Sequence, residues 1–203
     1  MDKLQTDGDW RLDRIVTSLL TRLSIGSRAD KRPEVSGFTL IELLVTISIV
    51  GIMLTVAIPG FRDFIQNSRI ATQTNGLVLA MTYAKSEAVK RGLSVSVCSR
   101  STDTACAGST TWDGGWLVFV DNNGDGTVNG ADQVLQVRSS LEGNNTLRAS
   151  ANAVTFQNTG FSPTNNGTFN LCDSRGASST TGRNIALTVQ GRVTSTTGAT
   201  TCP

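Results

Sequence analysis

The chain has 203 residues and carries 18 lysines and arginines against 16 aspartates and glutamates, so its net charge is +2. This length suits one domain with appendages and is hardly enough for two, and the near-neutral balance gives no global reason to expect a polyanionic partner. Histidine is absent, which excludes histidine-based triads, histidine general bases and histidine-containing metal sites.

Residues 1–37 form a polar leader that mixes acidic and basic residues. Its longest apolar piece, RIVTSLLTRL, is far too short to cross a bilayer. An ordinary secretory signal places its apolar region before the cleavage point, whereas here the apolar region follows the polar one. We expect no folded structure in this leader, whose length a start codon assigned too far upstream would explain.

The apolar run from Phe38 to Ile58 has one formal charge, Glu42. Its length predicts a single transmembrane helix of about 30 Å. Pro59 and Gly60 follow, and the proline is expected to bend or loosen the helix where it leaves the lipid.

Helical periodicity continues from Phe61 to Arg91 and predicts the second half of one long helix, about 80 Å in total. Lys90 and Arg91 followed by Gly92 are typical of a helix end, with cations in the last turn and a left-handed cap. Five apolar residues recur on one face and are expected to contact a sheet: Ile70, Leu77, Met81, Ala84 and Ala88.

After Gly92 the hydrophobic period changes to two, and turn residues separate the apolar segments. The expected strands are 93–98, 116–120, 133–138, 153–156, 167–172 and 184–189, and 191–195 is expected to form a hairpin with the last of these. Residues 93–203 are therefore predicted to be a β-rich head. The fold class is α+β, with a long N-terminal helix packed on a mostly antiparallel sheet.

The four cysteines are Cys98, Cys106, Cys172 and Cys202. All follow the apolar run, and an even number in a non-cytosolic domain favours disulfides over zinc. Three connectivities are open. We favour Cys98–Cys106 and Cys172–Cys202, because these pairs close the shorter loops and the second would hold the C-terminus; free buried thiols are the alternative.

The segment Gly37-Phe38-Thr39-Leu40-Ile41-Glu42 resembles the prepilin signature of type IV pilins and type II secretion pseudopilins. The resemblance implies a pilin fold, cleavage between Gly37 and Phe38 by a prepilin peptidase, and N-methylation of Phe38. The mature chain would be 38–203, with a transmembrane segment at 38–58, a periplasmic half-helix at 59–92 and the head at 93–203.

Glu42 is the residue that a simple anchor would not need. A carboxylate within the bilayer costs about 2–3 kcal/mol on insertion scales. Its place in the first helical turn returns about 0.3–1 kcal/mol through the helix dipole. The family resemblance implies that Glu42 pairs during assembly with the terminal amine of a neighbouring subunit; the alternative is a glutamate that only snorkels to the interface.

Residues 112–137, WDGGWLVFVDNNGDGTVNGADQVLQV, and 184–193 narrow the resemblance to GspH/FimT-type pseudopilins and minor pilins. Residues 139–183 carry no motif for this assignment. The implied function is a minor pilin that initiates or caps a type IV pilus, with a pseudopilin of type II secretion as the alternative. The implied partners are other pilins or pseudopilins, the prepilin peptidase and the inner-membrane assembly platform. The implied location is the inner membrane with the head in the periplasm, then the filament tip.

The segment 121–132, DNNGDGTVNGAD, matches the spacing of an EF-hand-like calcium loop. Asparagine, aspartate and glycine are also the residues that tight turns prefer. Strands are expected on both sides of this segment, and its last position is an aspartate rather than the usual glutamate. We therefore favour a hairpin loop, with calcium binding as the minor alternative. No other cofactor is expected. The candidate ligands are Asp121, Asn123, Asp125, Thr127, Asn129 and Asp132, with Gly126 at the turn.

DNA binding is a further hypothesis, because some FimT-type proteins use a C-terminal Gly-Arg-x-Arg motif. Here Gly191-Arg192-Val193-Thr194 keeps only the first arginine, and Arg183 or Arg175 would have to lie near it. Of the 18 basic and 16 acidic residues, 7 and 6 lie in 1–37, which leaves 11 basic and 10 acidic residues in the mature part. No broad basic surface follows, so nucleic acid is the less favoured partner.

Catalysis has almost no support in the sequence. Serine and threonine are abundant, but no histidine base, Ser-x-x-Lys or Gly-x-Ser-x-Gly pattern accompanies them. Trp112 and Trp116 are expected to pack inside the head rather than to hold a ligand. We therefore expect a structural assembly protein rather than an enzyme.

Overall fold

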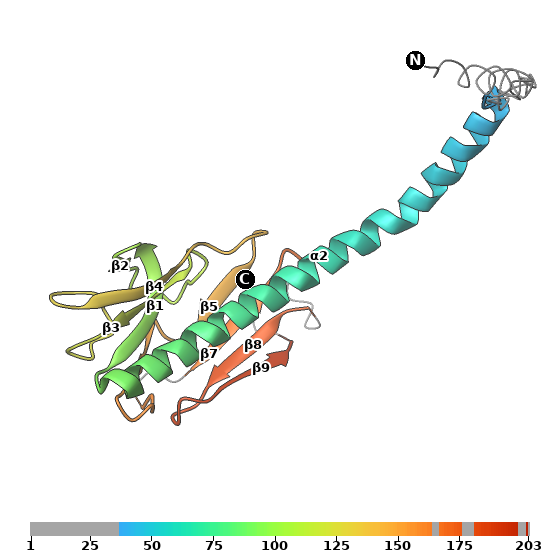
Figure 1. Ribbon diagram of the computed structural model, residues 1–203. Coiled ribbons are helices and arrows are strands. Elements are labelled where there is room, and N and C mark those ends of the chain that lie inside the picture. Colours follow the sequence, from blue (N-terminus) through green and yellow to red (C-terminus); the bar gives the residue numbers. More distant parts are fainter. Residues whose placement is uncertain (1–36, 164–166, 176–180, 199–201, 203) are drawn as a thin grey trace, which may run out of the picture. The chain divides into compact units, whose positions relative to one another are not determined.

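The structure is a computed structural model and describes residues 37–163, 167–175, 181–198 and 202. Most of the predicted leader, 1–36, lies outside the described residues. The described chain contains one long helix, α2, followed by the nine strands β1 to β9 (Figure 1).

Helix α2 spans Leu40–Arg91 without interruption, which confirms the prediction of one long helix. Pro59 lies inside it and has no N–H to donate to the carbonyl four residues earlier, yet the helix continues on both sides. The helix ends as predicted: Gly92 adopts a φ of 68° and donates its N–H to the carbonyl of Ala88 at 3.0 Å.

The strands form two antiparallel sheets. The first has the order β2-β1-β3-β4, with β6 also paired to β1, and the second has the order β5-β7-β8-β9. The strand bounds are β1 Val95–Thr102, β2 Ala105–Cys106, β3 Trp116–Val120, β4 Gln133–Arg138, β5 Thr146–Ala149, β6 Ala153–Phe156, β7 Thr168–Cys172, β8 Arg183–Leu187 and β9 Val193–Thr197.

The strands β3, β4 and β6 have the predicted bounds, and β8 pairs with β9 in the predicted hairpin. The turn of that hairpin is longer than expected: β8 ends at Leu187 and β9 begins at Val193, and the N–H of Thr188 donates to the carbonyl of Arg192 between them. Two strands were not expected. β2 is two residues long, and β5 lies in a segment without clear alternation, so both depend on their partners β1 and β7.

One core joins the helix to both sheets. All five residues of the predicted helix face are buried in it, together with residues of β1, β3, β5, β6, β7 and β8. Trp112 and Trp116 are also buried, and the Trp112 ring meets Phe169 edge-on with centroids 5.0 Å apart. The prediction that these tryptophans pack inside the head is confirmed, and α2 crosses both sheets in Figure 1.

Candidate functional site: the exposed helix and its supports on the head

Thr39 caps the beginning of α2. Its hydroxyl accepts the N–H of Glu42 at 3.2 Å, and its carbonyl accepts the N–H of Leu43 at 3.1 Å. Glu42 is thus the third helical residue, where the N-terminal end of the helix dipole favours a carboxylate. The role of Thr39 was not predicted, although Thr-x-x-Glu is the spacing of a capping box. Gly37 and Phe38 precede the helix and are exposed, with Phe38 at 81%.

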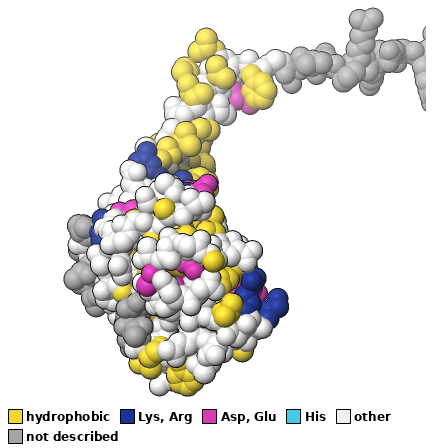
Figure 2. Space-filling view, turned by 90° about the vertical axis from the view of Figure 1, so that its left-hand side faces the viewer, with side chains coloured by type: hydrophobic (Ala, Val, Ile, Leu, Met, Phe, Trp, Pro, Cys, Tyr) yellow, Lys and Arg dark blue, Asp and Glu magenta, His cyan; other side chains and the backbone are white. Residues whose placement is uncertain are grey.

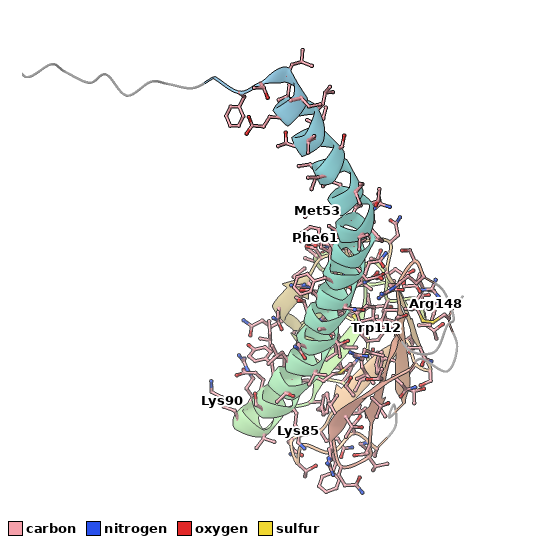
Figure 3. All side chains as sticks on the ribbon, turned by 90° about the vertical axis from the view of Figure 1, so that its right-hand side faces the viewer. Met53, Phe61, Lys85, Lys90, Trp112 and Arg148 are labelled. Carbon is pink, nitrogen blue, oxygen red and sulfur yellow. A yellow bond between two sulfur atoms is a disulfide. The ribbon has the colours of Figure 1, made fainter. Side chains whose placement is uncertain are left out.

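The apolar side chains of the first part of α2 are exposed. Every residue from Gly37 to Phe64 is exposed. Among the large apolar side chains, Ile52 is 70% exposed and Val56 is 76% exposed. In the part of the chain that the structure describes, this helix alone is long and apolar enough to cross a membrane, judged by length and composition. Figure 2 shows hydrophobic side chains gathered along the helix outside the head, and Met53 and Phe61 are labelled on it in Figure 3.

Three hydroxyl groups within the apolar stretch are satisfied by the helix itself. Thr46, Ser48 and Thr55 donate to backbone carbonyls three or four residues earlier, at 2.8, 2.7 and 2.7 Å. These bonds remove free donors from a surface that is otherwise apolar. Glu42 is the acidic residue of this stretch, which makes its carboxylate the distinctive polar group there.

Arg175 connects the segment after β7 to the helix near its first contact with the head. Its guanidinium pairs with Asp173 and donates to Asn67 at 2.8 Å and to Asp63 at 3.4 Å. Burial opposes the charge of Asp173, whose side chain is 1% exposed, but the hydrogen bonds and charge of Arg175 outweigh it and hold the pKa of Asp173 below its ordinary value. This cluster was not predicted, because Arg175 lies more than 100 residues after Asp63 and Asn67 in the sequence.

Further along the helix, buried polar side chains fix the head against α2. Gln73 donates to the carbonyl of Glu142 at 3.0 Å and accepts from Asn145 at 2.6 Å. Lys85 donates to the carbonyls of Gln190 and Gly191 at 2.9 and 3.1 Å, and it is labelled in Figure 3 where the helix lies against the head. Hydrogen bonds to different loops of the head therefore hold the helix at several positions along its length.

The loop 121–132 connects β3 to β4, which pair as an antiparallel hairpin, so the hairpin interpretation is confirmed. Asp121 is fully buried, and its carboxylate accepts the N–H groups of Gly124 and Gly126 at 2.7 and 2.8 Å and the hydroxyl of Ser96 at 2.6 Å. The N–H of Thr127 and the side chain of Asn123 hold the pKa of Asp125 below its ordinary value.

The remaining candidate calcium ligands serve the same loop. Asp132 accepts the backbone N–H groups of Asn122 and Asn129 at 3.0 and 3.1 Å, and the Asn129 amide donates to Asp125 at 2.7 Å. Within the described residues, no group of three or more acidic, cysteine or histidine side chains is arranged to hold a metal ion. The carboxylates thus organise the turn, and calcium binding stays an untested prediction.

The disulfides follow the favoured connectivity. Cys98 is bonded to Cys106 and Cys172 to Cys202, with Cα atoms 5.7 and 5.8 Å apart. The first bond joins β1 to β2, and the second joins the end of β7 to the C-terminal region. Because Asp173 directly follows Cys172, the second disulfide lies next to the Arg175 cluster.

Two arginines of the DNA hypothesis, Arg183 and Arg192, do not converge. Arg183 begins β8 and pairs with Thr197, whereas Arg192 lies in the turn at the other end of β8. About 16 Å of strand lies between them along β9. Arg175 forms ion pairs with Asp63 and Asp173. The hairpin therefore keeps Arg183 away from Arg192, so this pair does not supply the second cation that the DNA hypothesis requires.

Comparison with known families gives two matches that together span most of the chain. The family described as Type II transport protein GspH matches residues 73–191, and the Prokaryotic N-terminal methylation motif matches residues 33–58. A fimbrial protein of Pseudomonas aeruginosa is 33% identical over 98 residues, which are 45% of this chain and 63% of the relative. The type IV major fimbrial protein FimA of Dichelobacter nodosus is 36% identical over 72 residues, 36% of this chain and 37% of that protein.

The chain therefore spans less than two thirds of the length of these curated relatives. A crystal structure of the type IV minor pilin FimU of Pseudomonas aeruginosa aligns with a TM-score of 0.51 and 20% identity, over 64% of this chain and 90% of that one, and this likeness supports the pilin fold. Since the GspH match covers more than half of the sequence and the methylation motif covers the start of the helix, the chain belongs to the GspH family of type IV pilin-like proteins.

Proposed function

We propose that this protein is a minor pilin that helps to initiate or cap a type IV pilus. A prepilin peptidase removes residues 1–37 and methylates Phe38. Residues 38–58 then hold the protein in the inner membrane with the head in the periplasm. On assembly, the apolar helix contacts other pilins, and Glu42 sets its register by pairing with the terminal amine of a neighbour. The role is structural rather than catalytic.

The observation that carries this proposal is the difference in burial along α2. From Ile70 onward one face of the helix is buried in the core, whereas the large apolar side chains from Phe38 to Phe64 are exposed. Such a surface needs lipid or other apolar helices as its environment. Glu42 lies in the first turn of this helix, within the segment that matches the methylation motif. This position supports a helix that anchors the protein in the membrane and later contacts other subunits during assembly.

The test compares Glu42→Gln with Glu42→Asp in the full chain expressed in its own cells. We expect both variants to insert and to be processed, because neither alters Gly37 or the apolar length. Glu42→Gln should reduce incorporation into sheared filaments at least tenfold, since a neutral amide cannot pair with an ammonium group. Glu42→Asp keeps the charge and should retain more incorporation. Normal incorporation of Glu42→Gln would contradict the proposed pairing.

Processing needs a separate measurement. Mass spectrometry of the filament-associated chain should find Phe38 as its N-terminal residue, carrying one methyl group. Substitution Gly37→Val should leave the unprocessed chain in the membrane fraction, because a branched side chain replaces the residue that the peptidase accepts. A mature N-terminus elsewhere in the chain would show that the cleavage site is wrong.

A pseudopilin of type II secretion is the second candidate, and the description of the matching GspH family favours it. Both systems use the same helix, cleavage motif and head. A deletion strain examined for twitching motility and for exoprotein secretion separates them. Loss of secretion with normal motility would replace the pilus assignment by the secretion assignment.

DNA binding is a third candidate, and it depends on Arg192 alone because Arg183 lies at the other end of β8. One arginine contributes little affinity at physiological salt. A gel shift at low salt that disappears in Arg192→Ala would support it, and the absence of a shift would end it.

A further inference from the structure

A pocket of about 140 Å³ lies between α2 and the loop that follows β4. Two arginines from different elements line it, Arg69 of the helix and Arg138 at the end of the strand, together with Ser68, Ser140 and Glu142. Arginine guanidinium groups beside hydroxyl groups are typical ligands of an oxyanion.

The acidic residue of the pocket does not neutralise these arginines. Within the described residues, no ion pair joins Glu142 to either arginine, and neither guanidinium has another acidic partner. Four other arginines are paired with carboxylates of the chain: the pairs are Arg91–Glu87, Arg100–Asp103, Arg148–Asp113 and Arg175–Asp173. The two arginines of the pocket, by contrast, line one pocket and form no ion pair among the described residues.

The pocket is built into the fold. Its inner wall includes Gln73, which is 5% exposed and held by Asn145 and by the backbone of Glu142. Arg69 lies across Gly143, where an added Cβ would stand 2.8 Å from its Nη1 atom, and Gly143 has a φ of 75°. The loop is therefore fixed to the helix before any ligand arrives, which lowers the entropy cost of binding.

We propose that this pocket binds a carboxylate side chain of a neighbouring protein subunit. Two arginines and one glutamate leave a charge of about +1, which matches a single carboxylate better than a phosphate dianion. A nucleic acid would need a row of cations, and the mature chain has 11 basic against 10 acidic residues by the count given above. The identity of the partner as a subunit rests on the proposed assembly function, whereas the carboxylate chemistry does not.

The binding test uses the full chain in detergent micelles, labelled so that the arginine Nε–H signals are resolved by NMR. The probes are acetyl-Gly-Glu-Gly-amide, its glutamine counterpart, inorganic phosphate and a short single-stranded oligodeoxynucleotide. We expect the glutamate peptide to shift the signals of Arg69 and Arg138 saturably. Arg62 and Arg192 are matched controls, since no ion pair holds either of them in the described structure, and should shift little.

Variants make this test sharper. Glu142→Gln removes a like charge and should tighten the peptide about two- to fivefold, an effect that a purely structural role would not produce. Arg69→Gln should abolish saturation; its unfolding midpoint is measured alongside. Equal shifts at all four arginines, or no tightening in Glu142→Gln, would overturn the site. Tighter binding of phosphate or of the oligodeoxynucleotide would overturn its carboxylate preference.

A second experiment addresses the partner. In cells, Arg69→Glu should reduce filament incorporation about tenfold relative to Arg62→Glu, because only the first places a carboxylate inside the pocket. Normal incorporation of Arg69→Glu, together with the expected loss in Glu42→Gln, would reject the pocket as a subunit contact and leave the proposed function intact.

Discussion

Helix α2 behaves as two different helices joined end to end. Before Phe64 its apolar residues are exposed, with Ile52 at 70%, whereas from Ile70 onward one face is buried, with Leu77 at 1%. Composition already distinguishes them, because the run from Phe38 to Ile58 carries one formal charge, whereas in the second half five apolar residues recur on one face. The difference lies in the packing: the second half packs on the two sheets, whereas the apolar side chains of the first half are exposed in the part of the chain that the structure describes. A helix that is apolar all round is built for lipid or for other helices.

The largest expected effect is on stability and appears only in the packed half. Leu77→Ala removes a buried side chain and should cost about 3–5 kcal/mol of unfolding free energy for the head. The same change in the exposed half, Leu54→Ala, should cost less than about 0.5 kcal/mol. Near-ultraviolet circular dichroism of Trp112 and Trp116 in detergent micelles follows the head in both variants. Equal losses would show that the exposed half also supports the head.

The next effect concerns the disulfide beside the helix contact. Replacing Cys172 and Cys202 by serine removes a disulfide between residues 30 positions apart and should lower the free energy of unfolding by about 3 kcal/mol. Removing the disulfide between Cys98 and Cys106, which are 8 positions apart, should lower it by about 2 kcal/mol. Unfolding midpoints of the two double variants test this order. A larger loss from the short link would show that strain or packing, rather than loop length, controls it.

Arg175→Ala should remove about 2 kcal/mol at neutral pH by leaving Asp173 buried without its partner. In the native protein the pKa of Asp173 is lowered, so its stabilising contribution is present above the unfolded value of about 3.9 and is lost as the pH falls through the lower folded value. In the variant, burial dominates and raises that pKa, so the destabilisation should shrink at acidic pH. Unfolding measured from pH 3 to pH 7 checks this.

A control for the Arg175 cluster is the double variant Arg175→Ala with Asp173→Asn. It removes both charges, so it should lose the pH dependence assigned to this pair and recover part of the stability at neutral pH. If the double variant is as unstable as Arg175→Ala at pH 7, the loss comes from the contacts of Arg175 with Asp63 and Asn67 rather than from an unpaired buried charge.

The smallest expected effect on the head belongs to the first turn of the helix. Thr39→Ala removes the cap on Glu42 and should lower the local helix stability by about 1 kcal/mol, while the unfolding of the head stays unchanged. Thr39→Ser keeps the hydroxyl and is the matched control. Amide hydrogen exchange at residues 40–46 measures the local change. A shifted unfolding midpoint for the head would show that the two halves of α2 are more strongly coupled than their contacts indicate.

Much of the fold is predictable because its signals are local. The buried helix face at Ile70, Leu77 and Met81 follows from a hydrophobic period of about 3.6 residues. The end of the helix at Gly92 follows because the residue after the last turn needs a positive φ. The strands β3 and β4 follow from a period of two. By contrast, β2 and β5 carry weak patterns of their own and exist because β1 and β7 pair with them.

The sequence by itself determined the apolar helix and its acidic residue Glu42, and it favoured the disulfide pairs that the structure contains, because these depend on composition, spacing and short loops. Only the tertiary structure decided which distant side chains meet. It placed Arg175 beside Asp63, brought Arg69 and Arg138 to one pocket, and separated Arg183 from Arg192. Contacts between residues far apart in the chain depend on how the sheets pack on the helix, and no local pattern records that packing.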